Sequence, residues 1–112
     1  MTIRTTPFFR KQVRRLVKTY RHAETDCTEA LREFNPEQCF ALGAGLFKVR
    51  APNSDIPCGK SGGYRIIVFF QADKGVLTPL IAYSKRDREN VTEAEIIHAL
   101  ETVLDEIRRK IP

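Results

Sequence analysis

One short segment, residues 64–70, constrains the fold of this chain more than any other. Its side chains are apolar at every position except Arg65. A continuous apolar run of this length, bounded by turn residues, is typical of a strand that is apolar on both faces. Residues 51–63 before it are rich in Pro, Gly, Ser and Asn, which predicts a surface loop. The sequence therefore predicts a central strand of a sheet at residues 64–70.

Two more strands are predicted beside this one. Residues 46–50 alternate apolar and cationic side chains, which places Lys48 and Arg50 on one face of a half-buried strand. Residues 80–84 supply another strand, and Pro79 confines it to the sheet edge or marks its first residue. Because an Asp-Lys-Gly turn precedes this last strand, we expect antiparallel neighbours in a meander.

Two helices are predicted before the strands. The first begins at Thr6 as N-cap with Pro7 in the first helical position, where the missing N–H does no harm. The second covers residues 26–34, with Asp26 and Glu29 spaced as a capping pair. The apolar stripe of the first helix consists of Phe9, Val13, Leu16, Val17 and Tyr20.

The last helix has the clearest start. Thr92 and Glu95 form a T-x-x-E capping box, and Val91 and Ile96 are spaced for a hydrophobic staple. Its apolar stripe is predicted to be Ile97, Leu100, Val103, Leu104 and Ile107. Together the elements predict an α+β fold: two N-terminal helices and a C-terminal helix packed on a small, mainly antiparallel, curved β-sheet. The length of 112 residues predicts one domain, 1–112.

The cysteines and apolar runs limit the location and the chemistry. A membrane span needs about 20 apolar residues, and no run here approaches that length or resembles a signal peptide, so we expect a cytoplasmic protein without membrane contact. Cys27, Cys39 and Cys58 are an odd number without a C-x-x-C pair, and neither His22 nor His98 completes a zinc-binding spacing. Reduced thiols, no metal and no cofactor are expected.

Charge is segregated along the chain. Residues 1–22 carry seven basic side chains and no acid, and residues 48–88 carry eight basic and three acidic ones. The other two segments are net acidic: residues 23–47 hold one base and five acids, and residues 89–112 hold three bases and six acids. This pattern favours contact with a polyanion such as nucleic acid, although an acidic protein partner or a solvated helix face would also account for it.

The side chains that can carry chemistry are mostly cations. The sequence has no nucleophile triad, metal cluster, P-loop or dinucleotide-binding motif. Adjacent antiparallel strands can bring basic side chains into one cleft, where guanidinium groups bind a phosphate in bidentate fashion. The candidates are Lys48, Arg50, Lys60, Arg65, Lys85 and Arg86. The sequence therefore indicates phosphodiester chemistry.

Arg65 is the strongest of these candidates, because a charge in an otherwise apolar strand requires a partner or a ligand. Tyr64 and Tyr83 can stack on a base or donate a proton, but packing alone would also explain an aromatic residue in a strand. Lys74 and Arg88 are interpreted as cations that keep loops and strand ends soluble.

Three segments resemble the RelE/HigB-type toxins of bacterial type II toxin–antitoxin systems, in the RelE/ParE superfamily. They are F-K-V-R at residues 47–50, G-K-S-G-G-Y-R at 59–65 and Y-S-K-R-D-R-E-N-V-T at 83–92. The resemblance covers most of residues 46–100 and implies a RelE-like fold. One departure is Thr92, because well-studied ribosome-dependent members have a tyrosine there.

The resemblance implies an mRNA interferase: a metal-independent, ribosome-dependent endoribonuclease that inhibits translation with the RNA 2′-OH as nucleophile. The implied catalytic residues are Lys48, Arg50, Arg65 and Arg86, and the implied RNA-binding residues are Lys60, Tyr64, Tyr83 and Lys85. The implied partners are mRNA, the ribosome and a cognate antitoxin, for which a helix-turn-helix protein is one candidate. The general acid and base are left unassigned.

Two other functions are compatible with the same residues. A ParE-like toxin would bind DNA gyrase and cut nothing, since one fold can support both activities. A non-catalytic RNA-binding or regulatory module would use the same basic surface only to hold phosphates. The Lys/Arg cleft favours cutting over gyrase binding, and steep salt dependence without cleavage would support the binding module.

Overall fold

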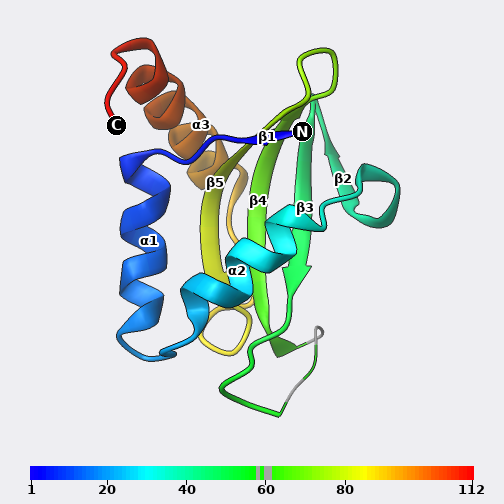
Figure 1. Ribbon diagram of the computed structural model, residues 1–112, viewed down its shortest axis with the longest axis vertical. Coiled ribbons are helices and arrows are strands. Elements are labelled where there is room, and N and C mark those ends of the chain that lie inside the picture. The colour runs from blue at the N-terminus through cyan, green and yellow to red at the C-terminus, as the bar shows by residue number, and fades with distance from the viewer. Residues whose placement is uncertain (58, 60–61) are drawn as a thin grey trace.

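The computed structural model of the protein describes residues 1–57, 59 and 62–112 (Figure 1). Its elements, in chain order, are β1 Thr2–Ile3, α1 Pro7–Val17, α2 Ala23–Arg32, the 3-10 turn η1 Pro36–Gln38, β2 Phe40–Gly43, β3 Leu46–Ala51, β4 Tyr64–Gln71, β5 Val76–Ser84 and α3 Glu93–Arg108. The first helix follows Thr6 and begins with Pro7, as predicted. No helix in the described part of the chain is long and apolar enough to cross a membrane.

In the described residues, five strands form one sheet in the order β1-β5-β4-β3-β2. The strands from β2 to β5 pair antiparallel with their neighbours in sequence, and β1 joins β5 in parallel. The predicted α+β fold with a mainly antiparallel sheet is thus confirmed. The sequence pattern did not indicate β1 or β2, because β1 has only two residues and β2 is exposed along its whole length.

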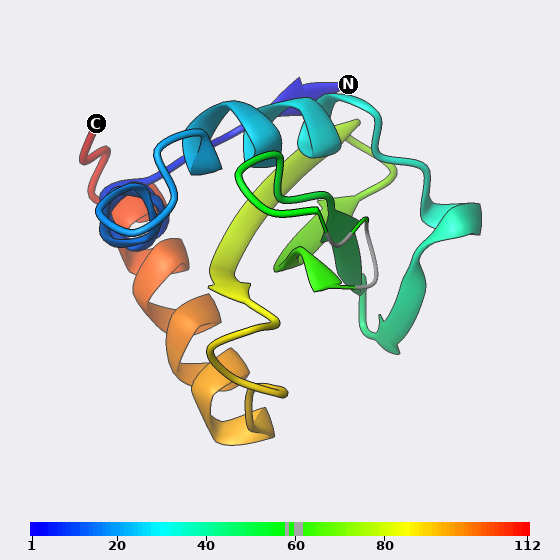
Figure 2. The same cartoon turned by 90° about the horizontal axis from the view of Figure 1, so that it is seen from below.

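The helices cover both faces of the sheet (Figure 1 and Figure 2). α2 crosses one face, α3 lies on the other face beside β5, and α1 runs along the β5 edge between them. β4 serves two cores at once, since Ile66 and Val68 belong to the core with α2, and Ile67 belongs to the core with α3. This double burial explains the apolar run that predicted the strand.

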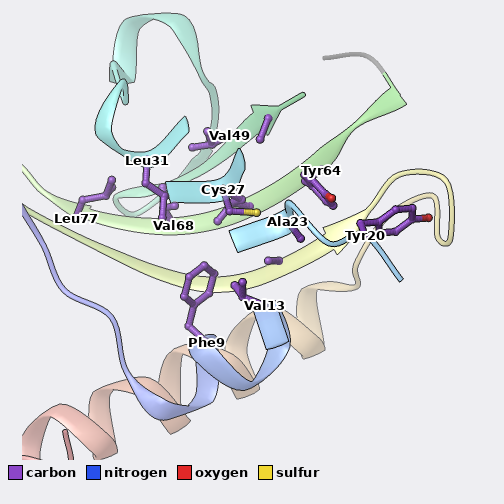
Figure 3. Packing of buried hydrophobic residues seen from close by; sticks show 13 residues of the cluster. Phe9, Val13, Tyr20, Ala23, Cys27, Leu31, Val49, Tyr64, Val68 and Leu77 are labelled. Atoms are coloured by element: carbon purple, nitrogen blue, oxygen red, sulfur yellow. The ribbon is translucent and has the colours of Figure 1, made fainter. Parts of the chain in front are cut away.

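The larger core lies between the sheet and the first two helices (Figure 3). Phe9 and Val13 from α1 and Cys27 and Leu31 from α2 belong to the same cluster as Val68 on β4. Burial raises the pKa of the Cys27 thiol to about 12. Cys27 therefore acts as a small hydrophobic residue.

α1 closes the part of the β5 edge that β1 leaves uncovered. Gln12 donates a hydrogen bond from Nε2 to the Leu80 carbonyl oxygen at 2.8 Å, and its Oε1 accepts one from the Ala82 N–H at 3.3 Å. The side-chain amide thus bonds to two backbone groups that a neighbouring strand would otherwise satisfy.

The second helix begins at Ala23 instead of residue 26. Asp26 lies inside the helix, where its Oδ2 accepts hydrogen bonds from the Ser54 N–H at 2.9 Å and from Ser54 Oγ at 3.0 Å. The predicted capping pair of Asp26 and Glu29 is therefore wrong. The carboxylate of Asp26 fastens the loop after β3 to α2, a long-range contact that the local pattern does not contain.

β5 is longer than predicted and contains Pro79 in its interior. The register with β4 shifts between Ile67 and Val68, where Leu80 on β5 has no direct partner. Pro79 lies beside this bulge and beyond the short pairing with β1, so its missing N–H breaks no regular ladder. Pro79 is thus not the first residue of the strand.

The predicted capping box at the start of α3 is confirmed. Thr92 Oγ1 accepts a hydrogen bond from the Glu95 N–H, and Glu95 Oε1 accepts one from the Thr92 N–H, both at 3.1 Å. Val91 and Ile96 belong to the same core, as the staple predicted. These contacts hold the start of α3 against the loop that follows β5.

The buried stripe of α3 is narrower than predicted. Ile97 is 50% exposed and Leu104 is 42% exposed, whereas Ala99 and Val103 are almost wholly buried. The prediction for Ile97 and Leu104 is wrong because α3 packs on the sheet through the neighbouring strip of its surface.

Candidate active site

Three predicted side chains form a row across the sheet. Arg50 on β3 pairs directly with Arg65 on β4, and Arg65 pairs with Tyr83 on β5. Side chains that are opposite on adjacent antiparallel strands share a face, with Cβ atoms about 5 Å apart. α3 packs on the β5 side of this face (Figure 2). The row therefore leads from the α3 core toward the opposite edge of the sheet.

Lys48 and Lys85 extend this row into a cluster of cations. Lys48 lies on the same face of β3 as Arg50, and Lys85 directly follows the end of β5. The pKa of Lys48 is lower than its ordinary value, first because the amine is partly desolvated, and then because Lys85, Arg65 and Arg50 are nearby positive charges. We call Lys48, Arg50, Arg65 and Lys85 the basic cluster.

The basic cluster lines a groove of about 750 Å³. The groove passes over the edge of β3 where the pairing with β2 has ended, and its other wall contains Asp26 and Glu29 from α2 and the C-cap residue Glu33. A bound anion would be attracted to the sheet side and repelled from the helix side. The charges therefore define which wall of the groove can hold a phosphate.

Arg65 is nearly buried, with 5% of its surface exposed. Its Nη1 donates a hydrogen bond to the Tyr64 carbonyl oxygen at 3.1 Å. A guanidinium offers five N–H donors in a fixed plane, and this one stands beside other cations in a low-dielectric position. A phosphate in the groove would lower the electrostatic free energy of the whole basic cluster.

Gly63 brings the strand ends of the site together. A Cβ at this position would collide with the Ala51 carbonyl oxygen, so only glycine lets the chain entering β4 come this close to the end of β3. The Gly63 carbonyl oxygen also accepts a hydrogen bond from the Lys85 N–H at 2.9 Å. This glycine of the G-K-S-G-G-Y-R segment thus holds the ends of β3, β4 and β5 in contact.

Tyr83 is held in place by the loop after β5. Its hydroxyl donates to Asn90 Oδ1 at 3.5 Å, and the Arg88 guanidinium carbon lies 5.8 Å from the centre of its ring. Arg88 also binds both carboxylate oxygens of Glu95, at 2.8 and 2.9 Å. The interpretation of Arg88 as a merely solubilising cation was wrong, because this side chain connects the site to α3.

The protonation of Tyr83 and Glu95 follows from these contacts. Burial raises the pKa of Tyr83, although Arg65 and Arg88 act in the opposite direction, so the phenol is protonated at neutral pH. The hydrogen bonds from Arg88 are the main reason that the pKa of Glu95 is lowered to about 2. Tyr83 is therefore a neutral phenol beside positive charges, and it is nearly buried, with 5% of its surface exposed.

Asn90 belongs to the site but was not predicted from the sequence. Its Oδ1 accepts a hydrogen bond from Lys48 Nζ at 3.0 Å, across 42 residues of sequence. The available signal was weak: Asn90 ends the S-K-R-D-R-E-N block and stands two residues before the N-cap of α3.

Tyr64 lies on the opposite face of the sheet from the basic cluster. It is wholly buried in the core with α2, and its ring packs edge to face on the ring of Tyr20, with the two ring centres 5.9 Å apart (Figure 3). Consecutive residues of a strand point to opposite faces, so Tyr64 and Arg65 cannot both face the groove. This placement does not support the prediction that Tyr64 contacts RNA.

Two further candidates stand apart from the cluster or beyond the description. Arg86 is exposed in the turn after β5 and lines a smaller pocket with Lys85, Ile56 and Pro57. Lys60, predicted to bind RNA, lies outside the described residues. Among residues 1–57, 59 and 62–112, no group of three or more His, Cys, Asp or Glu side chains is arranged to hold a metal ion.

Fold and site together define a class: a small α+β protein with a basic groove suited to an anionic substrate. A family profile described as "RelE toxin of RelE / RelB toxin-antitoxin system" matches residues 6–108. The chain therefore belongs to the RelE toxin family, as its motifs predicted. It is the toxin of a type II toxin–antitoxin system, which implies a cognate antitoxin as partner. A comparison with curated proteins gives no match.

Proposed function

We propose that this toxin is an endoribonuclease that cuts mRNA, with the RNA 2′-OH as nucleophile. Toxins of this family are generally ribonucleases. The observation that carries the proposal is the direct cross-strand pair of Arg50 and Arg65, with Lys48 and Lys85 beside it. Four cations on one wall of a groove are suited to bind a phosphodiester and to stabilise added negative charge on it.

The proposed reaction is an internal transfer at phosphorus. A base removes the proton of the 2′-OH, the 2′ oxygen forms a bond to the adjacent phosphorus, and the bond from phosphorus to the 5′ oxygen breaks. An acid gives a proton to the departing 5′ oxygen. The products are a 2′,3′-cyclic phosphate and a 5′-hydroxyl, and one proton is taken up for each one released. Negative charge grows on the phosphoryl oxygens in the transition state, which is where cations accelerate the step.

We assign the base to Lys48 and the acid to Tyr83. The lowered pKa of Lys48 makes its neutral amine more abundant than that of a free lysine, whereas Arg50 stays protonated and cannot accept a proton. Tyr83 keeps its proton at neutral pH and stands next to Arg65 in the row across the sheet. Arg50 and Arg65 are then the residues that stabilise the transition state.

The flanking cations are assigned to RNA binding. Lys85 lines the same groove as Arg65, and the next residue, Arg86, is exposed in the turn after β5. We assign these two side chains to phosphates on either side of the scissile bond, where they would contribute affinity more than rate. The assignment of Lys60 to the same task rests on its sequence position alone.

The finer proposal, cutting on the ribosome, is supported by the exposed side of α1. Lys11, Arg14, Arg15 and Lys18 lie at positions i, i+3, i+4 and i+7, and all four are exposed. We call these four residues the α1 stripe. Like charges at such spacings destabilise a helix by about 0.2–0.5 kcal/mol per pair, and α1 contains no acid to offset this. A large RNA surface would reverse that cost by binding the stripe.

The experiment that tests the function uses the purified protein with translating ribosomes, with the same mRNA free in solution, and with DNA gyrase. We expect new mRNA 3′ ends carrying a cyclic phosphate in the ribosome reaction, and unaffected supercoiling by gyrase. Loss of supercoiling without RNA cutting would instead establish a ParE-like toxin. Salt-sensitive RNA binding without cutting would establish a binding module.

A further inference from the structure

We propose that Asn90 is a positioning residue of the active site: its side-chain oxygen holds the amine of Lys48 at the wall of the groove while leaving that amine able to lose its proton. The proposal rests on the proposed ribonuclease function for its meaning, but its structural part can be tested without RNA. It concerns a residue that lies in the 83–92 segment but was not among the predicted site residues.

The orientation of the Asn90 amide follows from its donors. Oδ1 accepts hydrogen bonds from Lys48 Nζ at 3.0 Å, from the Val91 N–H at 2.9 Å and from the Tyr83 hydroxyl at 3.5 Å. An ammonium and a backbone N–H can only donate, so the atom that faces both must be the oxygen and not the NH₂ group. One acceptor therefore links β3, β5 and the start of α3.

Asn90 is itself held from several sides. Arg88 Nε donates to the Asn90 carbonyl oxygen at 3.0 Å, and the same guanidinium is bound to Glu95 on α3. The next residue, Val91, is buried in the α3 core, and Thr92 then begins the helix with its capping box. The position of the amide is thus fixed by the start of α3 independently of its contact with Lys48. A positioning group requires this, because it must itself be held in place.

The chemical type of Asn90 matters because Lys48 is already surrounded by charge. Among the described residues, the charged and titratable groups around Lys48 are Arg50 on β3, Arg65 on β4, Tyr83 on β5 and Lys85 at its end, and β2 contributes the apolar Phe40 opposite Lys48. One carboxylate stands beyond them: Glu89 accepts a hydrogen bond from Lys85 Nζ at 2.9 Å. Cations favour the neutral amine, and a neutral amide oxygen accepts a hydrogen bond without adding a negative charge. A carboxylate at position 90 would reverse this balance and favour the ammonium.

The test compares the full-length protein with Asn90→Asp and Asn90→Ala, and uses Gln71→Glu as a control that adds one carboxylate at the far end of β4. Titration of the Lys48 side chain by NMR, without RNA, measures its pKa directly. Single-turnover cleavage as a function of pH measures the same group during the reaction. Far-UV circular dichroism checks that each variant keeps its fold.

For Asn90→Asp we expect a Lys48 pKa higher by about one unit or more, and a cleavage profile whose rise moves to higher pH by the same amount. For Asn90→Ala we expect a Lys48 pKa that does not rise. The single-turnover rate at saturating RNA should be lower by about tenfold or more, with the half-saturating RNA concentration nearly unchanged, because the amine is present but no longer oriented. Gln71→Glu should change neither quantity.

The outcomes separate this proposal from the proposed function. A Lys48 pKa in Asn90→Asp equal to that of the unaltered protein would overturn the contact itself. Equal cleavage by Asn90→Ala and the unaltered protein would overturn the positioning role. If the unaltered protein cuts no RNA but Asn90→Asp still raises the Lys48 pKa, then the amide–lysine link is real and the proposed ribonuclease function is what fails.

Discussion

Arg50 and Arg65 stand directly opposite each other on the adjacent antiparallel strands β3 and β4. Like charges in this arrangement destabilise a sheet, and the central strand β4 offers Arg65 little solvent to screen the repulsion. The same geometry places two guanidinium groups where one phosphate can bind both. We therefore expect the pair to weaken the unbound fold and to strengthen the binding of an anion.

Replacing Arg50 by glutamine should make the unbound protein more stable. Removal of one cross-strand charge is expected to raise the free energy of unfolding by about 0.5 kcal/mol, which corresponds to an increase in Tm of roughly 2–4 °C. Thermal denaturation at low salt measures this. The stabilisation by a non-cleavable 2′-deoxy dinucleotide should be lost in the same variant. Arg32→Gln, an exposed cation on α2, is the matched control, and a Tm for Arg50→Gln at or below that control would contradict the prediction.

Arg65→Ala should reduce the rate of RNA cleavage by about a hundredfold. If Arg65 stabilises the transition state, its loss costs about 3 kcal/mol, comparable to removing one oxyanion donor. Single-turnover cleavage at saturating RNA is the measurement, with Arg65→Lys as a variant that keeps the charge but loses bidentate binding. A folded Arg65→Ala protein that cuts at the original rate would remove Arg65 from the mechanism.

The cleavage rate should rise with pH and level off below pH 10.5, the ordinary pKa of lysine. The sign follows from the direction of the shift: desolvation and neighbouring cations lower the pKa of Lys48, so the reactive neutral amine forms at lower pH than in a free lysine. Rates measured between about pH 6 and about pH 10 test this. Lys48→Arg should be slow and lack the rise, because arginine stays protonated. A profile that is unchanged in Lys48→Arg would exclude Lys48 as the base.

Thr92→Ala should cost stability but not activity. Thr92 Oγ1 is part of the capping box of α3, and loss of such a cap typically costs about 1 kcal/mol. Urea denaturation measures the stability, and cleavage below the unfolding range measures the activity. A large loss of cleavage with the fold intact would show that the threonine takes over the task of the tyrosine found there in related toxins.

Neutralising two members of the α1 stripe, Lys11→Gln with Arg15→Gln, should weaken ribosome binding and reduce its salt dependence. Each lost phosphate contact lowers the slope of log K against log salt by roughly one, so we expect a decrease of about two. The matched control neutralises Arg108 and Arg109, which are paired with Asp105 on α3. Equal slopes for both double variants would argue against an RNA contact at α1.

Most of the fold was predictable because short local sequence patterns determine most of its elements. Thr6-Pro7, the apolar run of β4 and the capping box at Thr92 each determine an element from neighbouring residues alone. The start of α2 was not predictable in this way, because Asp26 accepts a hydrogen bond from Ser54 in a distant loop instead of capping the helix. β1 was missed for a related reason, since two residues acquire strand geometry only by pairing with Val76 and Leu77.

The site was predictable where the alternation of side chains along a strand determines which face of the sheet each side chain is on. Lys48 and Arg50 share a face by their spacing, and pairing brings Arg65 and Tyr83 onto the same face. The same rule argues against an RNA contact by Tyr64, because Tyr64 is adjacent to Arg65 in the strand and points to the opposite face. Asn90 could not be predicted, since its contact with Lys48 depends on how the loop after β5 returns across the sheet.

Gln12 also affects whether a second copy of the chain can pair with the β5 edge of the sheet. An open strand edge is a template onto which a second chain can add a strand, and repeated addition leads to fibres and precipitates. The amide of Gln12 occupies the Leu80 and Ala82 backbone groups on β5 that such a chain would need. A single glutamine thus hinders a second copy of the chain from adding a strand along this stretch of the sheet when no antitoxin is bound.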